Sequence, residues 1–225
     1  MGIDYHETFA PVAKLPTIRL VLALCCERDW DIHGMDVKTA FLNSELEETV
    51  YMEIPEGISI PTAAALTGSQ SPMACRLLKS IYGLKQSPCA WYGRIHSFFI
   101  SNNFRRSEFD HSLFINNERP VILLLYVNDL VLAAPTWNYI SWIHSMLCKE
   151  FDMTDLGELQ TFLELEIKWN RGQGILHLLQ KRYVQKILKQ HGMESCNLAT
   201  TPADPHIRLE KNAGHEMSNG EKQTS

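Results

Sequence analysis

The sequence predicts an α+β domain in which an antiparallel sheet has helices packed on one face. Three observations support this class. The 225 residues are 45% hydrophobic and 21% charged, which is typical of a globular chain with a core in one or two domains. Short runs of apolar and β-branched residues lie in neighbouring pairs separated by turn residues, a pattern typical of hairpins. Segments with apolar residues at helical spacing lie between those runs.

Four longer helices are predicted, because apolar residues recur in four segments at intervals of three and four. Pro16 and Thr17 form a start signal for the first, Pro88 opens the second, and Gly192 closes the last. The segments and their apolar residues are Thr17 to Arg28 with Ile18, Val21, Leu22 and Cys25; the segment after Pro88 with Trp91, Ile95, Phe98 and Phe99; Trp137 to Phe151 with Ile140, Ile143 and Leu147; and KRYVQKILKQHG.

Strands are predicted where β-formers alternate or run together between turn residues. The predicted strand segments, in order, are WDIHGMDV, broken by Gly34 and ending at Asp36; TVYMEIPEG; the start of CRLLKSIYGLKQSP; two strands in SLFINNERPVILLLYV; and TFLELEIKW with ILHLLQ around the turn RGQG. KTAFLNSELEE is predicted to be a turn followed by a short helix, and residues 58–72 a surface loop. Residues 1–202 are expected to form the folded domain, and residues 203–225 a polar, disordered tail.

Charge and cysteine content exclude some classes of protein. The net charge is −5, which gives no support for a protein that coats nucleic acid, although a polymerase needs only a local basic track. No apolar run approaches the roughly 20 residues of a membrane span, and the start, MGIDYHETFA, is unlike a secretory signal. The six cysteines form no CxxC pair, which favours reduced thiols over disulfides or zinc. We therefore expect a cytoplasmic, reducing location and no membrane contact.

Two aspartates are candidates for a metal site. The stretch VILLLYVNDLVLAA predicts a tight hairpin with Asp129 at its tip, and Asp36 ends an earlier strand. If the two strands are sheet neighbours, the carboxylates converge into an oxygen site suited to Mg²⁺ and to nucleotidyl transfer with two ions about 3.5–4 Å apart. The alternative is that Asn128 and Asp129 only supply turn chemistry and that both aspartates are solvated.

Several segments resemble one family when taken together. They are DYHETFAPVAKLPTIRLVLAL, MDVKTAFLNSELEETVYMEIPEG, LLKSIYGLKQSPCAWY, YVND, FDMTDLGELQTFLELEI and LQKRYVQKILKQHGM. In this order they resemble the copia-type reverse transcriptase domain of LTR-retrotransposon Pol polyproteins. The resemblance implies a right-hand polymerase palm with partial fingers and little or no thumb. It also implies an RNA-directed DNA polymerase that extends a primer on an RNA or DNA template with dNTPs and two Mg²⁺ or Mn²⁺ ions, including within retrotransposon particles.

The resemblance also implies roles for individual residues. Asp36 and Asp129 resemble the catalytic, metal-binding aspartates. Val37, Phe41 and Gln86 are expected to bind the nucleotide, with Phe41 as the aromatic gate that excludes a 2′-hydroxyl. An ordinary buried Phe and a polar loop residue are the alternatives for Phe41 and Gln86. FLELEI and LHLLQ resemble the hairpin that supports the primer terminus.

The chain also departs from the family pattern. Asn128 stands where the family has the first Asp of Tyr-Val-Asp-Asp, so a catalytic ligand position is lost and weak or absent activity is expected. Cys89, Ser44 and Glu164 replace Arg, Gly and Gly, and Glu164 is expected to alter the backbone if its position needs a positive φ. The chain is also expected to be a fragment, truncated at both ends.

Two other interpretations stay open. One is a working polymerase with a substitute metal ligand. The other is a non-catalytic remnant, either inert or still able to bind nucleic acid, and the sequence predicts no oligomeric state. The candidate nucleic-acid contacts are Lys38, Lys79, Lys85, Arg94, Lys181 and Arg182, each of which has a solvated side chain as its alternative.

Overall fold

The computed structural model describes residues 8–58 and 74–199. Contacts divide the chain into two compact units, Met1–Gln180 and Lys181–Ser225, which are described separately. The predicted loop falls almost entirely, and the predicted tail wholly, outside the described residues, so the boundary at residue 203 stays a prediction.

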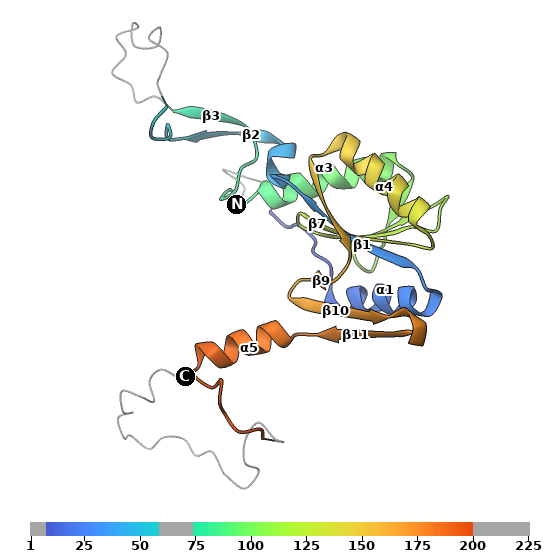
Figure 1. The fold of residues 1–225 in the computed structure, drawn as a ribbon. Coiled ribbons are helices and arrows are strands. Elements are labelled where there is room, and N and C mark those ends of the chain that lie inside the picture. Colours follow the sequence, from blue (N-terminus) through green and yellow to red (C-terminus); the bar gives the residue numbers. More distant parts are fainter. Residues whose placement is uncertain (1–7, 59–73, 200–225) are drawn as a thin grey trace, which may run out of the picture. The chain divides into compact units, whose positions relative to one another are not determined.

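The first unit is built on a six-stranded antiparallel sheet (Figure 1). Its order across the sheet is β4 (Phe104–Arg106), β5 (Leu113–Asn116), β6 (Ile122–Tyr126), β7 (Asp129–Ala134), β1 (Asp31–Val37) and β8 (Met153–Glu158). The order places β1, the earliest strand in the chain, between β7 and β8, so the pairings of β1 join distant parts of the sequence.

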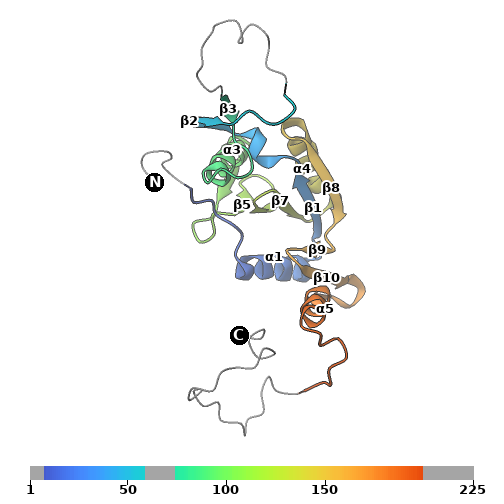
Figure 2. The same cartoon turned by 90° about the vertical axis from the view of Figure 1, so that its left-hand side faces the viewer.

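Helices cover both faces of this sheet (Figure 2). α3 (Ser87–Ser101) and α4 (Trp137–Glu150) pack on one face around a core that includes Met35 and Leu130. α1 (Leu15–Arg28) packs on the other face against a second cluster that includes Val131. The α+β class is confirmed, but the expectation that the helices share one face is wrong for α1. The physical reason is that β7 is apolar on both faces, so each face needs a cover.

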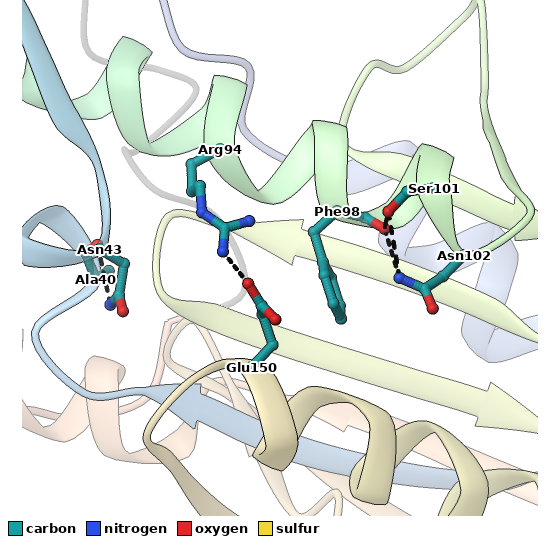
Figure 3. A network of polar contacts seen from close by, with 7 residues as sticks. All are labelled: Ala40, Asn43, Arg94, Phe98, Ser101, Asn102 and Glu150. Atoms are coloured by element: carbon teal, nitrogen blue, oxygen red, sulfur yellow. Dashed lines mark hydrogen bonds and ion pairs between the residues drawn. The ribbon is translucent and has the colours of Figure 1, made fainter.

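An ion pair joins the two helices of the first face (Figure 3). The Arg94 guanidinium of α3 donates to the Glu150 carboxylate of α4, and Phe98 lies between the helices. At the end of α3, the Ser101 hydroxyl and the Asn102 side-chain amide both donate to the Phe98 carbonyl at 2.8 Å, which satisfies an acceptor that the helix leaves free. The ion pair thus links α3 to α4, and the two bonds to the Phe98 carbonyl close the end of α3.

The segment 38–48 differs from its prediction. A 3₁₀ turn, η1 (Ala40–Asn43), is present, and the Asn43 side chain donates to the Ala40 carbonyl at 3.3 Å (Figure 3). The chain then enters strand β2 (Glu45–Met52) and not a short helix, because β2 pairs with β3 (Cys75–Lys79). Alternating exposure along β2 shows that cross-strand pairing overrides the local helix preference of its glutamates.

Gly34 lies inside a continuous strand and does not break it. The irregularity is in the partner strand β8, where the register shifts opposite Gly34 and Met35. A Cβ at position 34 would lie 3.1 Å from a methyl carbon of Leu159 and 3.3 Å from the Cβ of Leu156. The glycine therefore allows the close approach of β8 to β1.

A three-stranded sheet completes the unit. It consists of β9 (Thr161–Phe162), β10 (Leu165–Asn170) and β11 (Ile175–Leu179), with η2 (Arg171–Gln173) at the predicted turn. The Arg171 guanidinium donates to Asp29 at 2.7 Å and to Asp31 at 3.1 Å, and it lies 3.9 Å from the Trp169 ring centroid. This contact connects the turn to the start of β1.

The second unit contributes α5 (Lys181–Gln190), followed by Gly192 at a φ of 63°, as predicted for a helix end. All six cysteines are free thiols. Within residues 8–58 and 74–199, every helix is too short or too polar to cross a bilayer.

Candidate active site

Asp36 and Asp129 lie directly opposite each other on neighbouring strands β1 and β7. Residues facing each other in an antiparallel pair have Cβ atoms about 4.5–5.5 Å apart. Because side chains alternate along a strand, the neighbours Met35, Val37 and Leu130 point into the α3 and α4 core. The two carboxylates therefore project on the opposite face of the sheet, and both are half-buried.

The hairpin that presents Asp129 has a two-residue loop, Val127 and Asn128, between the paired residues Tyr126 and Asp129. Val127 has a φ of 59°. A β-branched residue is strained in this region, at a cost of about 1–3 kcal/mol. The turn therefore places its positive φ at Val127. From the sequence, Asn128 is the residue expected to favour the turn.

Three hydrogen bonds fix the hairpin tip. The indole N–H of Trp91 donates to the Val127 carbonyl at 2.7 Å. The backbone N–H of Val37 donates to the Asn128 carbonyl at 2.9 Å. The Asn128 side-chain amide donates to Oδ1 of Asp36 at 2.9 Å. Position 128 therefore lies against Asp36, with an N–H group where the family motif has a carboxylate.

The surroundings of Asp129 oppose its ionisation. Burial, and then the charge of Asp36, raise the pKa of Asp129 above its ordinary value. A bound cation would favour the charged form of Asp129. Two adjacent carboxylates with solvent access match the ligand preference of Mg²⁺, which binds one or two carboxylates together with water and phosphate oxygens.

The donor set fits one divalent ion better than two. Asp36 and Asp129 supply hard oxygen ligands for one ion. In the described part of the chain, no three His, Cys, Asp or Glu side chains are grouped so that they could hold a metal. Asn128 stands where a third carboxylate would be needed. Its side chain is a neutral amide that already donates a hydrogen bond to Asp36.

The expected nucleotide-binding residues lie in different surroundings. The Val37 side chain is buried in the core, so only its backbone takes part in the tip. Phe41 is buried as well, and its ring lies 4.4 Å from the ring of Tyr82. Gln86, which is 7% exposed, lines a cavity of about 620 Å³ whose lining includes Arg94 and neither aspartate.

Two residues near the tip were not singled out from the sequence as site residues. Trp91 was predicted only as core, and its proximity to Val127 has no local signal. Glu164 lines a cavity of about 200 Å³ together with Asp129. Its φ is 66°, so this position does need the positive φ that the family glycine tolerates, and the turn is kept despite the substitution.

Two of the candidate nucleic-acid contacts are engaged in ion pairs. Lys38 pairs with Asp152 at 3.0 Å, and Arg94 pairs with Glu150. Arg94 also lies 5.1 Å from the Phe151 ring centroid. These pairs partly neutralise the positive charge that both residues present.

The sequence of this chain is similar to those of known proteins. The family model for reverse transcriptase (RNA-dependent DNA polymerase) matches residues 1–205. The chain is 36% identical over 213 residues to the retrovirus-related Pol polyprotein from transposon TNT 1-94 of Nicotiana tabacum. It is 35% identical over 222 residues to that from transposon RE1 of Arabidopsis thaliana. The matches cover 93% and 96% of this chain but only 16% and 14% of the two relatives.

A yeast relative is similar over a shorter region. The chain is 32% identical over 171 residues to the putative transposon Ty5-1 protein YCL074W of Saccharomyces cerevisiae, which covers 75% of the chain and 53% of the relative. The sequence motifs, the antiparallel sheet and the family match agree. The chain belongs to the reverse transcriptase (RNA-dependent DNA polymerase) family and is a domain of the copia-type Pol polyprotein class.

Proposed function

We propose that this domain is an RNA-directed DNA polymerase palm whose catalysis is strongly impaired by Asn128. The observation that supports it most directly is the cross-strand pair of Asp36 and Asp129, with the Asn128 amide bonded to Asp36. The substrates would be dNTPs and a primer annealed to an RNA or DNA template. The six free thiols agree with a reducing, intracellular setting, such as a retrotransposon particle.

Asp36 and Asp129 would hold Mg²⁺ or Mn²⁺. When bound, the ion supplies charge neutralisation and activation of the primer hydroxyl for nucleotidyl transfer. The two residues orient their carboxylates through the rigid β1–β7 pairing. Val37 would contribute its backbone and Phe41 its ring at the nucleotide, and Gln86 would contact the nucleotide or the template.

The expected impairment follows from charge. An intact family member has a third carboxylate at position 128, and here that position has a neutral amide. Metal assistance is worth several kcal/mol of transition-state stabilisation, and about 1.36 kcal/mol corresponds to a tenfold change in rate. Loss of one ion ligand is therefore expected to lower the rate by about a hundredfold or more.

Primer extension tests this proposal. Purified protein is given a primer-template and dNTPs with Mg²⁺ or Mn²⁺, beside Asn128→Asp and the double variant Asn128→Asp, Asp36→Ala. We expect negligible extension by the parent, a gain of about a hundredfold or more in Asn128→Asp, and loss of that gain in the double variant. Rapid extension by the parent, sensitive to Asp36→Ala, would show that a substitute ligand works.

Binding distinguishes a non-catalytic remnant. Affinity for primer-template is measured over a range of salt concentrations in the same proteins. Binding that weakens steeply with salt, without extension by Asn128→Asp, would favour a nucleic-acid-binding module. The absence of both binding and extension would identify an inert remnant.

A further inference from the structure

Trp91 connects the helical layer to the hairpin tip. It lies in α3, is 1% exposed, and its ring meets the ring of Phe151 edge-on at 5.4 Å. The indole N–H is a donor without an acceptor function, and leaving it unpaired in the core would cost free energy. Its acceptor is the Val127 carbonyl, 36 residues along the chain and 2.7 Å away.

That carbonyl needs a partner from outside the hairpin. Tyr126 and Asp129 are the last cross-strand pair of β6 and β7, so the loop residue Val127 lies beyond the ladder. Val127 is also held at a positive φ. Rotation of the peptide between Val127 and Asn128 would change ψ of Val127 and φ of Asn128 and would turn the carbonyl away from Trp91. The hydrogen bond from Trp91 opposes such a rotation.

The next residue transmits the effect to the aspartates. The Asn128 carbonyl accepts from Val37, and its side chain donates to Asp36. A continuous path of hydrogen bonds and covalent bonds thus leads from the core to a proposed metal ligand. It runs from Trp91 through Val127 and Asn128 to Asp36. A change in the peptide that joins Val127 to Asn128 would displace the side chain at position 128.

We propose that Trp91 is a positioning residue, whose indole N–H holds the peptide between Val127 and Asn128 in its orientation and thereby directs the side chain at position 128 toward Asp36. Its importance for polymerisation rests on the proposed function. Its effect on the tip does not, because each of these hydrogen bonds joins two groups of the chain itself.

The test uses Trp91→Phe in the metal-free protein, with the side-chain NH₂ signals of Asn128 and the tip amides followed by NMR and hydrogen exchange. Trp169→Phe is the matched control, because the Trp169 indole N–H is buried and has no hydrogen-bond partner among residues 8–58 and 74–199. We expect Trp91→Phe to shift the Asn128 NH₂ signals toward solvent-exposed values and to speed exchange at the tip about fivefold or more. Trp169→Phe should leave both unchanged.

A second replacement separates the donor from packing. If Trp91→Phe does not fold, Trp91 is exchanged for the benzothienyl analogue of tryptophan, which keeps the ring shape and lacks the N–H. The same shifts of the Asn128 NH₂ signals and the same faster exchange at the tip are expected. Unchanged Asn128 signals and tip exchange in a folded variant without the donor would overturn the proposal and reduce Trp91 to a core residue.

The NMR and hydrogen-exchange results do not depend on whether the protein is an active polymerase. Failure of Asn128→Asp to extend a primer would contradict the proposed function without changing the NMR outcome. If that variant does extend primers, adding Trp91→Phe is expected to lower kcat more than it changes KM for dNTP. Equal kcat with and without the indole N–H would contradict positioning in the reaction.

Discussion

Replacing Asn128 by Asp should make the metal-free domain less stable and more responsive to cations. The change removes the hydrogen bond to Asp36 at 2.9 Å, and hydrogen bonds to charged groups contribute about 1.5–3 kcal/mol. It also adds a third negative charge beside Asp36 and Asp129. At about 4 Å and an effective dielectric constant near 20, a like-charge pair costs about 4 kcal/mol, and the half-buried setting lowers this by screening. We expect a net loss of about 3 kcal/mol.

Urea denaturation measures this change in the free energy of unfolding, with and without Mn²⁺. An ion that binds the native state at 100 times its Kd stabilises it by about 2.7 kcal/mol, so Mn²⁺ should recover most of the loss in Asn128→Asp. The parent should respond less, because it has one carboxylate fewer. Asn128→Ala is the control that removes the hydrogen bond without adding charge. The reasoning is refuted if Asn128→Asp is as stable as the parent without metal, or if Mn²⁺ stabilises all three proteins equally.

Two further predictions concern stability. Glu164→Gly should stabilise the domain by about 1 kcal/mol in urea denaturation, because Glu164 has a φ of 66° that glycine adopts without strain, and a destabilised variant would contradict this. Asp110→Asn should destabilise by about 2 kcal/mol at neutral pH. Burial alone would raise the pKa of Asp110, but hydrogen bonds from Thr17, Lys14 and Ser112 outweigh it and hold that pKa below its ordinary value. The stabilising effect is therefore complete above the unfolded-state pKa and is lost as the pH falls through the folded-state pKa. The prediction is contradicted if the loss of stability in Asp110→Asn relative to the parent stays constant down to strongly acidic pH.

The local sequence was sufficient for the elements with a strong period and for the family. Apolar spacing predicted α1, α3, α4 and α5 close to their observed bounds, and the hairpin of β6 and β7 followed from its two apolar arms. The family motifs identified Asp36 and Asp129 as the candidate metal-binding carboxylates. The structure places them opposite each other on neighbouring strands. The helices and the hairpin were predicted correctly because they depend on residues that are near each other in the chain.

The elements that the sequence did not predict depend on distant partners. β8 has the polar sequence MTDLGE and becomes a strand because it pairs along the free edge of β1. The second half of β2 was predicted as a strand, but its first half, residues 45–48, is extended and not helical because β2 pairs with β3.

The amino-acid sequence by itself therefore determined the family, the main helices, the hairpin and the loss of a carboxylate at position 128. Only the tertiary structure decided which face α1 covers, that Val127 and not Asn128 takes the strained conformation, and that Trp91 bonds to the tip. The physical reason is that packing and long-range hydrogen bonds select these states, and neither leaves a periodic pattern in the local sequence.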